Sequence, residues 1–157
     1  MSSFLWNLFL AAVWTASTGR FTLADAAFGF LIGFAVLWFA QRFVGPSPYV
    51  RKMAGVAAFM VFFLRELIEA NLRVAHDVIT RSHRMRPGVV AVPLDATTNT
   101  EITLIGNLLS LTPGTLTVDV SPDRRFIYIH AMHIDDPDSL RAQVKSGFER
   151  RVLELLR

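Results

Sequence analysis

Residues 53–82 read MAGVAAFMVFFLRELIEANLRVAHDVITRS, and this stretch joins a sequence typical of a membrane segment to one typical of a soluble domain. Its first twelve residues, Met53 to Leu64, carry no charge. Opposite charges four residues apart, as at Arg65 and Glu69, favour a helix over a strand. Apolar residues recur at the helical spacing of three and four, at Leu64, Leu67, Ile68, Leu72, Ala75, Val78 and Ile79. We predict one long helix over residues 53–86 that begins in lipid and ends in water before Pro87, and its first thirty residues, 53–82, would span roughly 45 Å.

The composition also separates a membrane half from an aqueous half. The chain is 52% apolar and 18% charged, and only five of its 16 basic and 13 acidic residues precede Arg65. It has no cysteine, which excludes a disulfide framework and a thiolate metal site. The net charge of +3 is modest and the aromatic residues lie mostly in the apolar half, so we predict no nucleic-acid partner.

The apolar half contains two short hydrophobic segments within residues 1–52, which we predict to be transmembrane helices. Phe4–Ser17 is short for a crossing, whereas Leu23–Val44 has the length and composition of a membrane-spanning helix. Gly29 and Gly33 form a G-x-x-x-G pair, a pattern that lets two helices pack closely.

The number of spans stays open at this stage. If the long helix also crosses, Arg42, Arg51 and Lys52 lie outside, against the tendency of basic residues to stay inside. If it runs along or obliquely into the inner face, those three lie inside and only Arg20 lies outside. The charges favour the second arrangement, and the uncharged run Met53–Leu64 favours the first.

The rest of the chain, residues 87–157, predicts a small α+β domain of order β-α-β-β-α. The signals are a short apolar run, a capping box at Thr98 and Glu101, a hairpin with Leu116, Val118 and Val120 on one face, and an N-cap at Asp136. The predicted elements are a strand over 89–94, a helix from 98 to 111, strands over 115–120 and 126–132, and one last helix from 137 onward. Two helices on one side of a mostly antiparallel sheet would resemble a ferredoxin-like fold without its last strand.

Few side chains offer chemistry. Arg65 and Glu66 follow the uncharged run, so inside the bilayer they would form a polar pair that serves a proton or ion path. We favour the alternative that they mark the exit into the interface, with Arg65 paired to Glu69. His130 and His133 are three apart on a predicted strand and would point to opposite faces, which argues against a shared metal. The sequence lacks the phosphate-binding, dinucleotide-binding, zinc-protease and hydrolase motifs, so we predict no catalytic residue, no cofactor and no enzyme activity.

The stretch Asn107–Val120 reads NLLSLTPGTLTVDV, a helix end, a Pro-Gly turn and the start of a strand. It resembles the N-L-L-T-L-T-P-G-T-x-x-V-D-V signature of the E subunit of the Mrp-type multisubunit Na+/H+ antiporter, with Ser110 in place of a threonine. The resemblance extends over the whole chain, including the return strand Tyr128–Ala131.

This resemblance implies an accessory, structural subunit of a hetero-oligomeric complex that exchanges monovalent cations such as Na+ for H+. The subunit would be a multi-pass protein of the cell inner (plasma) membrane, in contact with the lipid bilayer and other subunits, with residues 87–157 in the cytoplasm. Asn107, Thr112, Pro113 and Gly114 match the signature, and we expect them to serve folding and docking onto neighbouring subunits. Two alternatives remain: an ion path through Arg65 and Glu66, and a free-standing membrane-tethered domain that senses a ligand.

Overall fold

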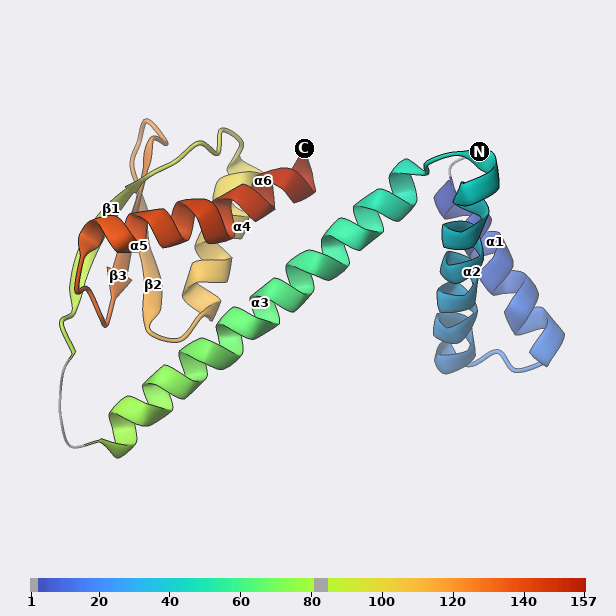
Figure 1. The fold of residues 1–157 in the computed structure, drawn as a ribbon, viewed down its shortest axis with the longest axis horizontal. Coiled ribbons are helices and arrows are strands. Elements are labelled where there is room, and N and C mark those ends of the chain that lie inside the picture. Colours follow the sequence, from blue (N-terminus) through green and yellow to red (C-terminus); the bar gives the residue numbers. More distant parts are fainter. Residues whose placement is uncertain (1–2, 81–84) are drawn as a thin grey trace. The chain divides into compact units, whose positions relative to one another are not determined.

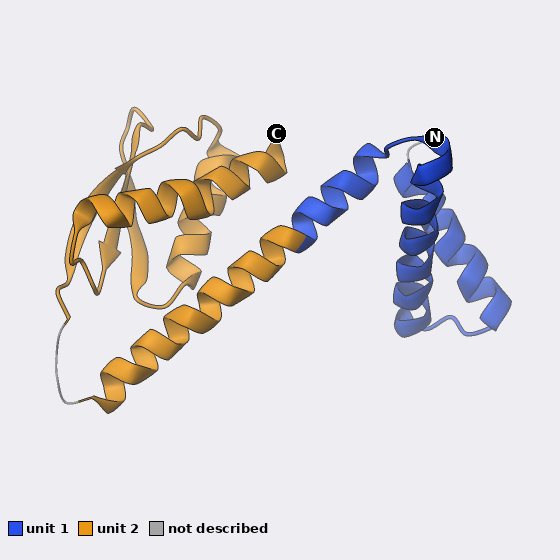
Figure 2. Cartoon of the chain, viewed as in Figure 1, with its two compact units in different colours: residues 1–57 blue, residues 58–157 orange. Residues whose placement is uncertain are grey.

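The computed structural model describes residues 3–80 and 85–157. The chain divides into two compact units, residues 1–57 and 58–157 (Figure 2). These boundaries differ from the division into 1–52, 53–86 and 87–157 drawn from the sequence. The reason is that the second part of the long helix packs with the α+β domain instead of forming a unit of its own.

Unit 1 contains α1 (Ser3–Thr18) and α2 (Leu23–Val44), which pack against each other (Figure 1). The predicted close contact at the G-x-x-x-G pair is confirmed, since Gly29 and Gly33 are both buried. A Cβ atom on Gly29 would lie 3.0 Å from the Trp14 Cβ, and one on Gly33 would overlap the side-chain oxygen of Asn7. Asn7 is fully buried, and its Nδ2 donates a hydrogen bond of 2.7 Å to Tyr49 Oη.

Among the described residues, α2 is the one helix that is long and apolar enough to cross a membrane by length and composition. The long helix, α3, runs from Pro48 to Ile79. It begins before the predicted Met53 because proline is well suited to the first helical position. Its predicted end at residue 86 is not reached: residues 81–84 lie outside the described part, and Arg86 forms an isolated bridge with His133.

The α+β domain contains a three-stranded antiparallel sheet in the order β1-β3-β2 (Figure 1). Its elements are β1 (Gly88–Pro93), α4 (Asn99–Leu111), β2 (Thr115–Val120) and β3 (Phe126–Ala131). The predicted capping box is confirmed, since Thr98 Oγ1 accepts from the Glu101 amide while the Glu101 carboxylate accepts from the Thr98 amide. The predicted positions of these four elements therefore hold to within one or two residues.

The last helix is not the single α-helix that the sequence predicts. It consists of α5 (Pro137–Gln143), a π-helical turn η1 (Val144–Glu149) and α6 (Arg150–Leu156). Apolar residues four apart drift by about 40° per step around an α-helix. The wider π turn, closed by bonds to the fifth residue, offsets that drift and keeps Val144, Phe148 and Val152 buried on one side.

The core of unit 2 lies between one face of the sheet and the helices. It is formed by Val90, Val92, Ala96, Ile102, Ile105, Leu108, Leu109, Ile127, Ile129, Val144, Phe148 and Val152. Phe59, Phe62 and Phe63 of α3 pack against this cluster.

Two of the three residues of the hairpin face predicted from the alternation of β2 are turned away from this core, whereas the third, Val120, packs against it. Leu116 and Val118 are exposed. Thr117 faces α4 instead, where its Oγ1 donates to the Gly106 carbonyl at 3.0 Å. The register shifts between Thr117 and Asp119, which marks an irregularity that interrupts the alternation.

Candidate functional site

The signature stretch folds into a tight turn between α4 and β2. Pro113 and Gly114 occupy its two central positions, and the Thr115 amide closes it by donating to the Thr112 carbonyl at 3.2 Å. Gly114 has φ of +91°. Proline first and a positive-φ glycine second are the pattern of a type II turn, which explains the order of these two residues.

Hydroxyl groups hold this turn on the end of α4. Thr112 is buried and its Oγ1 donates to the Leu108 carbonyl at 2.8 Å. Thr115 Oγ1 donates to the Leu109 carbonyl at 2.6 Å. These bonds satisfy carbonyls that the end of a helix leaves without an intrahelical partner. The turn also joins the sheet, because its Gly114 carbonyl accepts from the Met132 amide at 2.9 Å.

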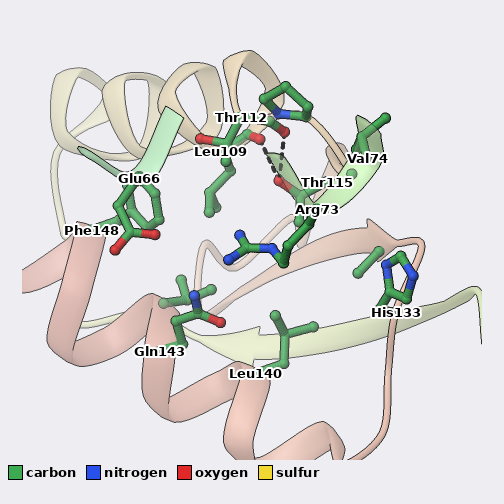
Figure 3. Close-up of a pocket in the computed structure, with 14 residues that line it drawn as sticks. Glu66, Arg73, Val74, Leu109, Thr112, Thr115, His133, Leu140, Gln143 and Phe148 are labelled. Atoms are coloured by element: carbon green, nitrogen blue, oxygen red, sulfur yellow. Dashed lines mark hydrogen bonds between the residues drawn. The ribbon is translucent and has the colours of Figure 1, made fainter. Parts of the chain in front are cut away.

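The turn lines a cavity of about 270 Å³ within unit 2 (Figure 3). The other walls come from α3, the end of β3 and the last helix. The polar and charged lining residues are Glu66, Arg73, Thr112, Thr115, His133 and Gln143. In Figure 3 the Arg73 guanidinium points into the space between the Thr112–Thr115 turn and the helix that carries Leu140 and Gln143. The cavity thus brings Glu66 together with five residues of the signature stretch, which are distant from it in the chain: Leu109, Thr112, Pro113, Gly114 and Thr115.

The two charged candidates of α3 separate in the structure. Arg65 is exposed and its Nε donates to Glu69 Oε1 at 2.7 Å, the pairing favoured from the sequence. Glu66 is half-buried and lines the cavity. Arg65 is thus engaged by Glu69, on a different side of the helix from the cavity that Glu66 faces.

Asn107, the first signature residue, lies on the exposed side of α4 and is not among the residues that line the cavity. The structure therefore groups Thr112, Pro113 and Gly114 with Glu66 and leaves Asn107 available at the surface.

Two contacts attach α3 to the domain on either side of the cavity. At one end the Asp77 carboxylate lies 3.1 Å from His133 Nε2. At the other, the Phe62 ring meets Phe148 edge-on at 5.5 Å between centroids, and the Arg151 guanidinium lies 3.9 Å above Phe62. Neither contact was foreseen, because nothing in the local sequence links positions so far apart.

His133 is thus a partner of Asp77, and the described residues contain no group of three or more histidine, aspartate or glutamate side chains that could hold a metal ion.

A second polar cluster ties the last helix to the segment after β1. The buried Glu149 carboxylate accepts from the amides of Asp95 and Ala96 at 2.6 and 3.0 Å. Lys145 Nζ lies 2.9 Å from Glu149 and 2.6 Å from Asp95. Partial burial acts to lower the pKa of Lys145, but its hydrogen bonds to Asp95 and Glu149 outweigh that effect and raise the pKa above its ordinary value.

The capping glutamate takes part in a similar tie at the C-terminus. Arg157 Nε donates to Glu101 Oε1 at 3.0 Å. This bond, together with the amides of Thr98 and Thr97, lowers the pKa of Glu101 to about 2. The sequence identified Glu101 as a cap, but its partner 56 positions away carries no local signal.

These features define a membrane-associated protein, in which an apolar helical unit with one bilayer-length helix continues through α3 into a small α+β domain. Comparison with known proteins narrows this class. Residues 7–155 match the family described as “Na+/H+ ion antiporter subunit”.

The chain is 34% identical to the E subunit of the Na(+)/H(+) antiporter from Alkalihalophilus pseudofirmus over 151 residues, 96% of each chain. It is also 34% identical to the E subunit of the Na(+)/H(+) antiporter from Bacillus subtilis over 153 residues, 98% of this chain and 97% of that one. The chain therefore belongs to the E-subunit family of Na+/H+ antiporters.

Two solved structures are similar. A chain of the Mrp complex from Dietzia sp. DQ12-45-1b has 29% identity and a TM-score of 0.51, over 65% of this chain and 96% of that chain. A chain of an archaeal respiratory membrane complex, the membrane-bound sulfane sulfur reductase, has 23% identity and a TM-score of 0.60, over 99% of this chain and 100% of that chain. The second similarity is one of fold alone.

Proposed function

We propose that the chain is an accessory subunit of a multisubunit cation/proton antiporter complex, which supports its assembly and stability and does not itself carry the ion path. One observation carries this proposal: the long apolar runs within these helices contain no group that binds and releases protons. The sequence has no ionisable residue between Ser3 and Thr18, between Asp25 and Arg42, or between Met53 and Leu64. A proton or cation path through a membrane is built from such groups.

The surface of unit 1 fits a role in assembly. Large apolar side chains of α1 and α2, among them Phe9, Trp38 and Phe39, are about half exposed. Exposed apolar area of this extent marks surfaces that lipid or other proteins cover. Among Asn107, Thr112, Pro113 and Gly114, Asn107 is the exposed residue, so we expect it to reach a neighbouring subunit.

The α+β domain is the part that we expect in the cytoplasm. Its strand order β1-β3-β2, with antiparallel pairs, is the order of a ferredoxin-like sheet from which the last strand is missing. Such a domain would brace neighbouring subunits at the membrane surface.

The test separates the amount of complex from its activity. Gly33→Leu places a side chain where a single Cβ already overlaps Asn7, so it separates α1 from α2. Gly55→Leu adds the same bulk at a position with no atom within 4 Å and is the matched control. Native mass after extraction in a mild detergent measures assembly, and cation-driven proton movement in inverted vesicles measures exchange.

For an accessory subunit, Gly33→Leu lowers the amount of complex and the maximal exchange rate in the same proportion, without changing the KM for Na+ or the pH profile. Gly55→Leu leaves both quantities at the parent level. A changed KM or pH profile in the complex that remains would contradict the accessory role.

Glu66 supports a second candidate, an ion path at an interface between subunits, because it is half-buried and faces the same cavity as Arg73. Glu66→Gln removes the charge while keeping the shape, and Glu69→Gln does the same at a carboxylate that is paired with Arg65 and does not line the cavity. Normal assembly with lost exchange in Glu66→Gln alone would establish the path. Unchanged exchange in both variants would remove it.

A further inference from the structure

The outer side of α3 carries an apolar stripe within unit 2, which we name the α3 stripe. Its members are 48–84% exposed, and they are Met60, Val61, Leu64, Ile68, Leu72, Val78 and Ile79. Successive residues of a helix are about 100° apart, so these seven fall in one sector along roughly 29 Å of helix. All seven are aliphatic or thioether side chains, which leave one side of α3 without a charge.

The opposite side of α3 is occupied by the α+β domain. Phe62 packs on Phe148, Ala70 is fully buried and Asp77 pairs with His133. The helix from Phe59 onward therefore has one face against the domain and one face that the domain does not cover (Figure 1).

The domain itself belongs in water. Its sheet has three strands in the order β1-β3-β2, so β1 and β2 are edges with unpaired backbone groups. Open sheet edges do not occur in the hydrocarbon region of a bilayer. Because the domain packs along α3 from Phe59, that part of the helix lies outside the hydrocarbon core too.

What remains of α3 is too short to cross a membrane. Pro48 to Ala58 spans about 16 Å of helix, roughly half of the hydrocarbon thickness of about 30 Å. In addition, α2 ends at Val44 and α3 begins at Pro48, so α3 starts at the membrane surface where α2 ends.

We propose that α3 lies along the membrane surface with the α3 stripe in the boundary between lipid headgroups and acyl chains. The chain then does not cross again after α2, and the α+β domain is on the same side as the link Gly45–Ser47. This assigns the uncharged run Met53–Leu64 to an interfacial helix. It also agrees with the tendency of basic residues to stay inside, because Arg42, Arg51 and Lys52 then lie on the inner side.

Two polar side chains, one at the border of the stripe and one within its sector, suit a position of α3 at the membrane surface. Arg65 borders it on a long stem that can carry the guanidinium up to the headgroups. Asn71 lies within the sector, and its Nδ2 donates to the Leu67 carbonyl at 2.7 Å, which lowers the cost of placing the amide against lipid.

The first test is the side of the membrane. Because the chain has no cysteine, Pro46→Cys and Ser146→Cys each give a single thiol. A membrane-impermeant maleimide is applied to the full chain in its own membranes, as inverted and as right-side-out vesicles. We expect both thiols to react in the same vesicle orientation. Reaction in opposite orientations would mean that α3 crosses, and would overturn the proposal.

The second test identifies what covers the stripe. Nitroxides at Ile68→Cys and Leu72→Cys are compared with Val36→Cys on exposed α2 and with Ser146→Cys in the domain. We expect both stripe positions to collide with oxygen more than with nickel-EDDA, at a depth shallower than Val36. Nickel access equal to that at Ser146 would place the stripe in water, and low access to both reagents would place it against a neighbouring protein of the complex. Either outcome overturns lipid contact, and neither depends on exchange activity.

Discussion

Replacing Gly114 by alanine tests whether the signature turn acts through its backbone. Gly114 has φ of +91°, a conformation that L side chains rarely adopt. An added Cβ would meet only the Met132 sulfur within 4 Å, at 4.0 Å, which is an ordinary contact. Steric overlap therefore contributes nothing, and the cost is that of the backbone conformation alone.

That cost is about 1–2 kcal/mol for an L-residue in the left-handed region. A loss of this size raises the unfolded fraction of a domain about 5- to 30-fold. Gly147→Ala is the matched control: its Cβ would lie 3.6 Å from Phe62, and its backbone does not have the positive φ. Since alanine favours a helix over glycine, that variant should gain about 0.5–1 kcal/mol.

Hydrogen exchange measured by mass spectrometry is the suitable assay, because Trp6, Trp14 and Trp38 all lie in unit 1 and do not report on unit 2. The amides of β3, which carries the buried Ile127 and Ile129, should exchange about 5- to 30-fold faster in Gly114→Ala, in purified full chain in mild detergent. Unchanged protection of β3 would refute the reasoning. Faster exchange confined to residues 112–116 would also refute it, since the turn would then open without the sheet.

Three further predictions concern other parts of unit 2. The Glu101 carboxylate stabilises the folded domain fully at pH values above its ordinary pKa of 4.5, and this contribution is lost as the pH falls toward about 2. Glu101→Gln should therefore reduce the fall in the free energy of unfolding between about pH 4.5 and 2. An unchanged fall over this pH range would contradict the capping assignment. Phe62→Ala removes the ring between Phe148 and Arg151 and should cost about 2 kcal/mol, less than a fully buried phenylalanine; urea unfolding followed by circular dichroism measures it, and an unaltered midpoint would mean that α3 does not depend on this contact. Asn107→Ala should leave the same midpoint unchanged and lower the yield of complex, whereas a lower midpoint with normal yield would assign Asn107 to folding.

Local rules predicted the elements of this protein well. The capping box at Thr98, the Pro113-Gly114 turn and the limits of α2 each depend on residues within a few positions, whose hydrogen bonds the backbone fixes without help from the rest of the fold. The G-x-x-x-G contact was also predicted correctly, because small residues at that spacing leave a surface that another helix can approach.

Contacts between positions that are distant in the chain could not be predicted from the sequence. Glu66 and the Thr112 turn meet only because α3 folds back on the domain, and Lys145 reaches Asp95 only because the last helix crosses the end of β1. The π turn was missed for a related reason: its extra residue per turn serves the packing of Val144 and Phe148 and has no signal of its own in the residues that form it.

The alternation along β2 predicted two faces of the strand but did not indicate which of them is buried. The apolar face with Leu116 and Val118 was the natural one to bury, yet α4 covers the other. Thr117 makes this arrangement acceptable, because its hydroxyl bonds the Gly106 carbonyl and its methyl group meets the glycine surface, where a Cβ would find Thr117 Cγ2 at 3.5 Å. A threonine can therefore occupy a half-buried position without leaving a polar group unpaired.

The positions of the charges along α3 follow from the different surroundings of its faces. Between Met53 and Leu64 a charge is absent on every side. Beyond that point Glu66, Arg73 and Asp77 all lie on the side that meets the domain, while Arg65 and Glu69 pair along the border. A helix that crossed the bilayer would gain nothing from such a division, since lipid surrounds it on all sides. A helix held between a soluble domain and a lipid surface requires this division, because one face must be polar enough to meet the domain and the other apolar enough to meet lipid.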